Sequence, residues 1–299
     1  MSLLIVGTTA LDSIKTPYSE NPRLLGGSAS FAAVAASAFT RPHLVGVVGK
    51  DFPARYINLY RRHEIDLSGL QRAPGQTFHW SGEYEVNMNH RRTLDTVLGV
   101  LEHFSPVLTP AHTRLPYVLL ANIAPAVQSR VLDQMRRPKF VMADTMDLWL
   151  NIALPDLLSL LRRVDALVLN DGEARQLAGQ DNLINALPCL HRLGPRYVII
   201  KKGEHGSILS GPDGLFLAPA YPLKNLVDPT GAGDSFAGAL MGYLASQGGA
   251  VKAHLRDALL HGSAAASFCC EGFGLRRLAA AGRAGVAQRV RELRKRTAV

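Results

Sequence analysis

The chain has 299 residues, of which 47% are hydrophobic and 19% are charged, a composition that can bury a sizeable core and argues against disorder. The formal net charge is +9, but residues 276–299 hold eight Lys or Arg residues and one Glu, which leaves +2 for residues 1–275. A basic terminal helix is usually a solvated face, and no nucleic-acid-binding motif accompanies it. We expect no specific nucleic-acid partner; an acidic partner or nonspecific nucleic-acid contact is the alternative.

The first hundred residues begin with alternating strands and helices, and the hydrophobic pattern then changes. Short apolar runs predict buried strands at 3–7 and 43–49, and helices are predicted at 28–39 and 52–63. Large and polar side chains then alternate in residues 77–86, as in a half-exposed antiparallel strand, and 93–100 is its expected partner. We predict a small sheet packed outside the main layer.

The alternation of strands and helices resumes after residue 100. Strands are predicted at 117–121, 139–143, 166–170 and 197–201, helices near 126–136, 152–163, 173–178 and 182–193, a hairpin at 207–217, and helices at 231–245 and 251–268. This order indicates an α/β fold with a mostly parallel central sheet and helices on both faces. Ligands bind at the carboxyl ends of such strands. Predicted strand ends carry Asp144, Asn170, Lys201 and Lys202, and Asp12 follows the first strand, so these residues are candidates for one shared cleft.

The strongest local signal is the run from Asp228 to Gly238, Asp-Pro-Thr-Gly-Ala-Gly-Asp-Ser-Phe-Ala-Gly. Gly231 and Gly233 permit a tight backbone at the start of a helix, where free amides and the helix dipole favour anions. Asp234 follows at once, so a carboxylate lies beside the predicted anion site and can accept a proton from an attacking hydroxyl. The alternative is a helix cap formed by Asp228 or Thr230, with glycines that only make the turn.

This run resembles the C-terminal signature of the PfkB/ribokinase family of ATP-dependent sugar and nucleoside kinases. Three further motifs resemble family marks in the expected order. They are Gly26-Gly27 before the Ala-rich helix, Asn170-Asp-Gly-Glu173, and Lys202-Gly-Glu-His-Gly206. The resemblance covers essentially the whole chain, and the pattern looks most similar to bacterial nucleoside-kinase-like members. It implies a single ribokinase-like three-layer domain, residues 1–299, with a β lid built from about 11–25 and 75–100.

The resemblance also implies a role for individual residues. Asp234 would be the catalytic base, and the backbone of Gly231, Ala232 and Gly233 would form the anion hole. The other implied contacts are Asp12, Gly26, Gly27 and Asn89 for the substrate, Asn170, Lys202, Gly203 and Gly206 for ATP, Asn170 and Glu173 for Mg²⁺, and Asp228 for K⁺. Two alternatives remain open: Asp12 as a turn cap and Glu173 as an ordinary first-turn helix acid.

The predicted lid carries aromatic side chains at positions 78, 80 and 84. A lid excludes water and completes the site once the substrate has bound. These side chains are expected to contact a ligand, to pack the lid on itself, or to form the sheet of a homodimer. The oligomer predicted is therefore a monomer or a lid-mediated homodimer.

The function implied is ATP-dependent phosphorylation of a primary hydroxyl on a small ribosyl compound, with a nucleoside favoured. A free-sugar kinase is the close alternative, and a nucleotide- or sugar-binding sensor without turnover is the alternative of another class. Ser28 and Ser30 stand where many relatives carry Asn after the paired glycines, and the strand end at Asp144 lacks the Asp-x-Asn-x-Arg pattern of many sugar kinases. These departures argue against a simple ribokinase.

The remaining signals concern location. The three cysteines have no zinc spacing and indicate reduced thiols. Residues 1–14 read as a strand rather than a signal peptide, and no apolar stretch is long enough to cross a bilayer. We expect a cytoplasmic protein that does not bind membranes.

Overall fold

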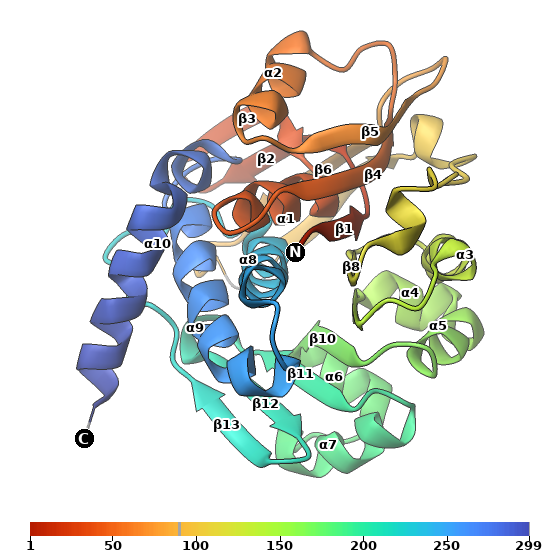
Figure 1. The fold of residues 1–299 in the computed structure, drawn as a ribbon. Helices are drawn as coiled ribbons and strands as arrows, with labels where there is room; N and C mark the ends of the chain where they lie inside the picture. Colours follow the sequence, from red (N-terminus) through yellow and green to blue (C-terminus); the bar gives the residue numbers. More distant parts are fainter. Residues whose placement is uncertain (89–90, 299) are drawn as a thin grey trace.

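The computed structural model describes residues 1–88 and 91–298. Its centre is a nine-stranded sheet within these residues (Figure 1). In spatial order the strands are β13 (Gly214–Ala218), β12 (Ser207–Gly211), β11 (Tyr197–Lys201), β10 (Ala166–Asn170), β9 (Phe140–Asp144), β8 (Tyr117–Leu120), β1 (Leu3–Val6), β4 (Pro42–Val48) and β5 (Asp66–Arg72). Seven neighbouring strands, β11, β10, β9, β8, β1, β4 and β5, are parallel, and β12 and β13 add an antiparallel hairpin.

Helices cover both faces of this sheet because its strands are apolar on both sides. Leu3 and Ile5 belong to one buried cluster, whereas Leu4 and Val6 belong to the other. The first face carries α1 (Ser28–Ser37), α2 (Ala54–Arg62), α8 (Ala232–Gln247), α9 (Val251–Cys270) and α10 (Arg276–Thr297). The second carries α3 (Pro125–Gln134), α4 (Asp147–Ile152), α5 (Leu154–Leu161), α6 (Asp171–Ala178) and α7 (Leu183–Arg192). The predicted three-layer α/β fold is confirmed.

A second sheet of four strands lies outside the main layer, and we call it the lid. Its order is β3 (Ser19–Gly26), β2 (Ala10–Thr16), β6 (His79–Tyr84) and β7 (Arg91–Val97). Ile14, Tyr84 and Met88 form its small buried cluster, with Trp80 and Phe273 packed against it. Every residue of β7 is exposed.

Three local predictions differ from the structure. The strand expected at 93–100 is β7, which ends at Val97 and is followed by a 3-10 turn, η1 (Gly99–Leu101), where Gly99 has a φ of 53°. The helix expected at 152–163 is α5, which is separate from α4 because Pro155 is tolerated only in a first helical turn. The edge strand β5 was not predicted, since its sequence Asp-Leu-Ser-Gly-Leu-Gln-Arg is largely polar.

Candidate active site

The signature run forms a turn that leads into α8. Gly231 is the residue before the helix and has a φ of 76°, and a Cβ there would lie 2.4 Å from the ring of Phe31. Glycine is therefore required by both conformation and space. The Asp228 carboxylate accepts a bond from the Thr230 amide (2.9 Å), so Asp228 stabilises the turn and does not cap α8 directly.

The helix start offers backbone donors, as predicted for an anion hole. The Ala232 amide donates to the Pro229 carbonyl (3.1 Å), whereas the amides of Gly231 and Gly233 have no backbone acceptor within residues 1–88 and 91–298. The first amides of a helix favour an anion. In this conformation Gly231 and Gly233 are the better donors of the predicted trio.

Lys201 adds a positive charge to this anion site. It is the last residue of β11, and its Nζ lies 3.0 Å from the position of a Cβ added to Gly233. The same Nζ pairs with the Asp144 carboxylate at the end of β9 (3.2 Å to Oδ1). Burial alone would lower the pKa of Lys201, but Asp144, Glu173 and Asp234 together raise it. A charged amine thus lies beside the helix start, where a phosphoryl group can bind. We call Asp144, Lys201, Gly233 and Asp234 the phosphate cleft.

Asp234 lies in the first turn of α8 and is half-buried. Burial raises its pKa to about 6, and the charge of Asp144 adds to the rise, while Lys201 and Arg91 oppose it. A carboxylate that titrates near neutral pH is suited to accept a proton from a hydroxyl.

Asp12 supplies a second carboxylate from β2. It is buried, and burial raises its pKa to about 7; the Gly27 amide opposes this rise, and the charge of Asp234 contributes to it. A Cβ on Gly26 would lie 1.8 Å from Asp12 Oδ2, so the glycine leaves room for the carboxylate. Gly27 has a φ of 90°, and a Cβ there would collide with the Thr8 carbonyl oxygen at 2.4 Å. The structure therefore brings Asp12 and the glycine pair together.

Asn170 and Glu173 form a capping box at the start of α6. The Asn170 Oδ1 accepts from the Glu173 amide (2.8 Å), and Glu173 Oε2 accepts from the Asn170 amide (2.7 Å). Burial raises the pKa of Glu173 to about 7, with Lys201 opposing and Asp144 adding to the rise. The cap uses one carboxylate oxygen of Glu173. The other oxygen of Glu173, together with the neighbouring buried carboxylate of Asp144, suits Mg²⁺, which prefers carboxylates and water as ligands.

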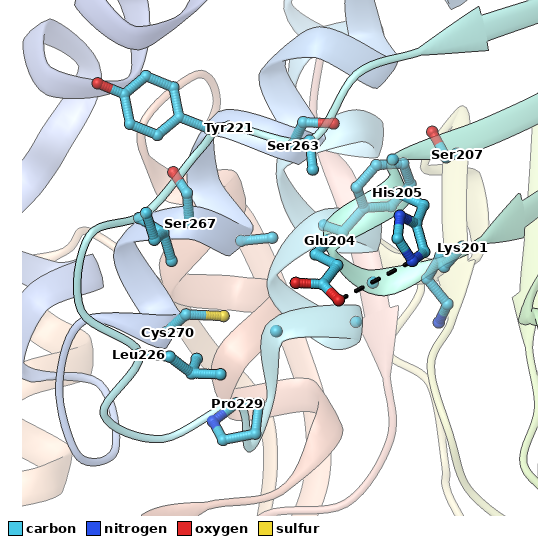
Figure 2. Close-up of a pocket in the computed structure, with 18 of the residues that line it drawn as sticks. Lys201, Glu204, His205, Ser207, Tyr221, Leu226, Pro229, Ser263, Ser267 and Cys270 are labelled. Atoms are coloured by element: carbon cyan, nitrogen blue, oxygen red, sulfur yellow. Dashed lines mark ion pairs between the residues drawn. The ribbon is translucent and has the colours of Figure 1, made fainter. Parts of the chain in front are cut away.

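A cavity of about 590 Å³ extends from the phosphate cleft (Figure 2). Gly203, Gly206 and Ser207 line it together with Lys201, whereas Lys202 is not among its lining residues. Figure 2 shows Lys201 and Ser207 on one side and Tyr221, Ser267 and Cys270 on the other. The volume lies within the range of small-molecule sites. Of the predicted ATP loop, the two glycines border this space, and the lysine that does so is the preceding one.

One end of the cavity lies near Tyr221 and Ser267, and we call it the Tyr221 end. The basic helix α10 contacts this end. Arg289 donates to the Ser267 hydroxyl (2.7 Å) and to Glu271 (2.7 Å). Its guanidinium lies 4.5 Å from the centre of the Tyr221 ring and 3.5 Å from that of Phe268. Charge patterning predicted a solvated face, or a surface for an acidic partner or nonspecific nucleic-acid contact, so this contact within the chain was missed.

Asp228 has the environment expected of a cation ligand. It is fully buried, and its Oδ2 has no hydrogen-bond partner among the described residues. Burial raises its pKa, and hydrogen bonding from Thr230 and from the Gly274 amide opposes this rise only in part. A monovalent cation would satisfy that oxygen. The last predicted contact, Asn89, lies outside the described residues.

Comparisons with known proteins identify the family of the chain. The profile of the pfkB family carbohydrate kinases matches residues 21–280. A cytidine kinase of Thermococcus kodakarensis is 30% identical over 252 residues, which cover 81% of this chain and 88% of the relative. The chain therefore belongs to the pfkB carbohydrate kinase family, and it is a phosphotransferase that acts on hydroxyl acceptors.

Two solved structures share the fold at low sequence identity. Arabidopsis thaliana ribokinase complexed with ribose and ATP has a TM-score of 0.78 at 21% identity and covers 96% of this chain and 98% of its own. Burkholderia thailandensis nucleoside kinase in complex with inosine has a TM-score of 0.77 at 18% identity and covers 97% and 96%. The fold is thus common to sugar and nucleoside kinases and does not distinguish them. Within the part of the chain that the structure describes, no helix is long and apolar enough to span a membrane.

Proposed function

We propose that this protein is an ATP-dependent nucleoside kinase that phosphorylates the primary hydroxyl of the ribose. The observation that carries the proposal is the pair of carboxylates Asp12 and Asp234, each with a pKa that burial raises, and the charge of Asp234 adds to the rise at Asp12. One carboxylate can bind a diol while the other accepts a proton. The 30% identity with a cytidine kinase favours a nucleoside as the carrier of that diol.

In the proposed reaction the protein mainly positions groups and stabilises charge. Asp12 accepts hydrogen bonds from the vicinal diol, which fixes the ribose ring. Asp234 accepts the proton of the primary hydroxyl as its oxygen attacks the γ-phosphorus of ATP. Lys201 and the Gly233 amide lie where they can stabilise the developing negative charge.

Mg²⁺ is proposed to lie near Asn170 and Glu173, with Asp144 close by. When bound there, this ion would supply positive charge that neutralises the phosphate oxygens. Burial, with the charge of Asp144, raises the pKa of Glu173 to about 7 despite the opposing charge of Lys201, so a further cation would stabilise the ionised carboxylate.

Asp228 is proposed to bind K⁺ through its unpartnered oxygen. Replacing K⁺ by Na⁺ or a bulky organic cation is expected to lower turnover. Equal rates in all three media would reject a role for the ion.

The oligomeric state stays a prediction of monomer or lid-mediated homodimer. The exposed edge strand β7 is the surface available for lid pairing. Light scattering on the purified chain and on a Leu94→Lys variant would separate the two states, since only a lid-paired dimer should dissociate.

An acceptor screen tests the main proposal. ATP consumption is measured with cytidine, uridine, adenosine, inosine, ribose and fructose, using Asp234→Asn as the inactive control. Asp213→Asn is the matched control, because Asp213 is exposed and pairs with Lys252. Nucleoside-dependent turnover is expected. Turnover with ribose alone would identify a free-sugar kinase, and ligand binding without any turnover would identify a sensor.

A further inference from the structure

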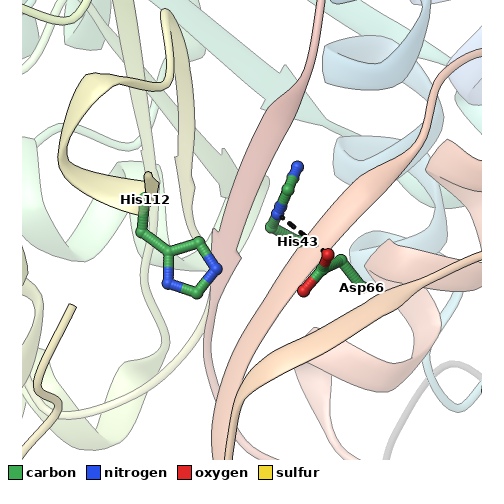
Figure 3. Close-up of side chains that lie close together, drawn as sticks. All are labelled: His43, Asp66 and His112. Atoms are coloured by element: carbon green, nitrogen blue, oxygen red, sulfur yellow. Dashed lines mark ion pairs between the residues drawn. The ribbon is translucent and has the colours of Figure 1, made fainter. Parts of the chain in front are cut away.

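A cluster of two histidines and one aspartate lies at the amino ends of β4 and β5 (Figure 3). His43 is the second residue of β4 and is in register with Asp66, the first residue of β5. His112 begins the 3-10 turn η2 (His112–Arg114), which precedes β8. These are the amino ends of parallel strands, whereas the active-site residues Asp144 and Lys201 stand at carboxyl ends. The cluster is therefore separate from the phosphate cleft.

The spacing of the three side chains suits a small metal ion. One potential ligand atom from each residue lies within 4.8 Å of the others. His43 Nδ1 is 3.7 Å from Asp66 Oδ2, which is too long for a hydrogen bond. Tetrahedral zinc, with bonds of about 2.0–2.1 Å, holds its ligand atoms about 3.4 Å apart. Small side-chain rotations would bring the third atom to that separation.

The hydrogen bonding of the histidines is incomplete. Among the described residues, the buried Nδ1 atoms of His43 and His112 have no hydrogen-bond partner. His43 Nδ1 faces Asp66, whereas His112 turns its Nε2 toward the other two residues and its Nδ1 away from them (Figure 3). His112 is only 1% exposed, so water does not compensate. Burial lowers the pKa of both imidazoles, with the charge of Asp66 opposing it. Burial therefore favours the neutral form of both rings, which is the form that can bind a metal ion through His43 Nδ1 and His112 Nε2.

The neighbouring contacts orient the carboxylate without closing the cluster. Asp66 Oδ1 accepts from the Ser68 amide (2.9 Å) and from the Ser68 hydroxyl. The same hydroxyl lies 3.1 Å from His112 Nε2, so it can hold the ring in place or give way to an ion. Arg41 pairs with Asp66 Oδ2 at 3.3 Å, but its side chain is 65% exposed. Such surface pairs are weak, and Arg41 can turn to solvent.

We propose that His43, Asp66 and His112 bind a divalent transition-metal ion of the zinc class, with water completing the coordination. Two imidazoles and one carboxylate favour zinc, copper or nickel over magnesium and calcium, which prefer oxygen ligands. The ion ties the starts of β4 and β5 to the segment that precedes β8. Its effect is on the stability of this edge of the sheet, and kinase turnover does not depend on it.

Zinc binding to the untagged full-length chain tests the proposal. The protein is treated with EDTA, dialysed, and equilibrated with Zn²⁺ in a large excess of Mg²⁺, which keeps Mg²⁺ in the carboxylate-rich phosphate cleft. Elemental analysis after equilibrium dialysis should give one Zn²⁺ per chain. Excess Zn²⁺ should raise the Tm by roughly 5 °C, because only the folded chain presents the three ligands together.

Variants test whether the three-residue cluster is the site that binds Zn²⁺. His112→Ala should weaken Zn²⁺ binding by about tenfold or more and abolish the Tm rise. His103→Ala is the matched control, since His103 is exposed and outside the cluster, and it should bind as wild type. Because His112 is buried and its variant can fail to fold, Asp66→Asn and His43→Gln are measured as well, with circular dichroism and kinase turnover as tests of folding. The proposal is overturned if wild type retains no Zn²⁺, or if folded Asp66→Asn and His43→Gln bind it as tightly as wild type.

Discussion

The main sheet and the lid differ sharply in how they are held. Each residue of β1 is fully buried, and two large clusters of apolar side chains pack on the two faces of the main sheet. The lid has one small cluster, built on Ile14, Tyr84 and Met88, and its edge strand β7 is exposed throughout. The groups proposed to act in phosphoryl transfer, Lys201 and Asp234, both come from the main body.

Low contact density marks the parts of proteins that open at small energetic cost. The lid also carries Asp12 and, at its end near the cavity, Met88. A direct bond joins it to the signature turn, where the Thr230 hydroxyl donates to the Tyr84 hydroxyl (3.0 Å). We infer that changes in the main body lower kcat, whereas changes in the lid mainly weaken substrate binding.

The largest expected effect is at the proposed base. Asp234→Asn keeps the shape but removes the proton acceptor, so kcat should fall by about 10²–10⁴-fold while ATP binding is almost unchanged. Steady-state kinetics with calorimetric ATP binding measures both, and Asp213→Asn should behave as wild type. Near-normal turnover would show that another group is the base.

Asp12→Ala should act on the substrate. The lost charged hydrogen bonds are worth on the order of 1.5–3 kcal/mol, which corresponds to roughly 10- to 150-fold weaker nucleoside binding. Calorimetric titration of nucleoside measures the Kd. If the Kd is unchanged and only kcat falls, Asp12 acts in turnover and not in substrate binding.

Tyr84→Phe removes only the hydroxyl that accepts from Thr230. The loss of one hydrogen bond, about 1 kcal/mol, should raise the nucleoside KM by about fivefold with a smaller effect on kcat. Tyr18→Phe is the control within the lid, because Tyr18 is 78% exposed. A selective fall in kcat for Tyr84→Phe would contradict the division of roles.

The smallest effect is expected at Arg289, which holds Tyr221 and Ser267 in place at the Tyr221 end of the cavity. Arg289→Ala should raise the KM for ATP roughly two- to fivefold, in line with about 0.5–1 kcal/mol, and leave the nucleoside KM unchanged. Arg289→Lys should restore part of the loss, and Arg294→Ala, which breaks only a surface pair with Asp257, should not change it. Parallel rises in both KM values, or an equal effect in Arg294→Ala, would reduce Arg289 to a general stabilising residue.

The sequence predicted what apolar runs and local motifs encode. Buried strands such as β10 and the turn before α8 follow from short segments, and their positions agree with the structure. The polar edge strand β5 escaped notice because an edge strand needs no continuous apolar run.

Contacts between distant segments were less accessible. Two lysines, Lys201 and Lys202, adjoin at the end of a predicted strand, but only the assembled sheet shows which one meets Gly233. Charge patterning cannot tell Arg289, which turns inward, from the arginines around it. The residues His43, Asp66 and His112 share no sequence motif, since three separate elements bring them together.

The pH dependence of kcat tests the central claim most directly. Asp234 has a pKa raised to about 6, so it holds a proton at lower pH and cannot accept one from the hydroxyl. At saturating substrates, kcat of the wild type should be flat above about pH 7 and fall about tenfold per unit below about pH 6. The residual rate of Asp234→Asn should lack this acid limb. The same limb in both proteins, or a wild-type kcat that does not change between pH 5 and 8, would contradict the assignment of Asp234 as the base.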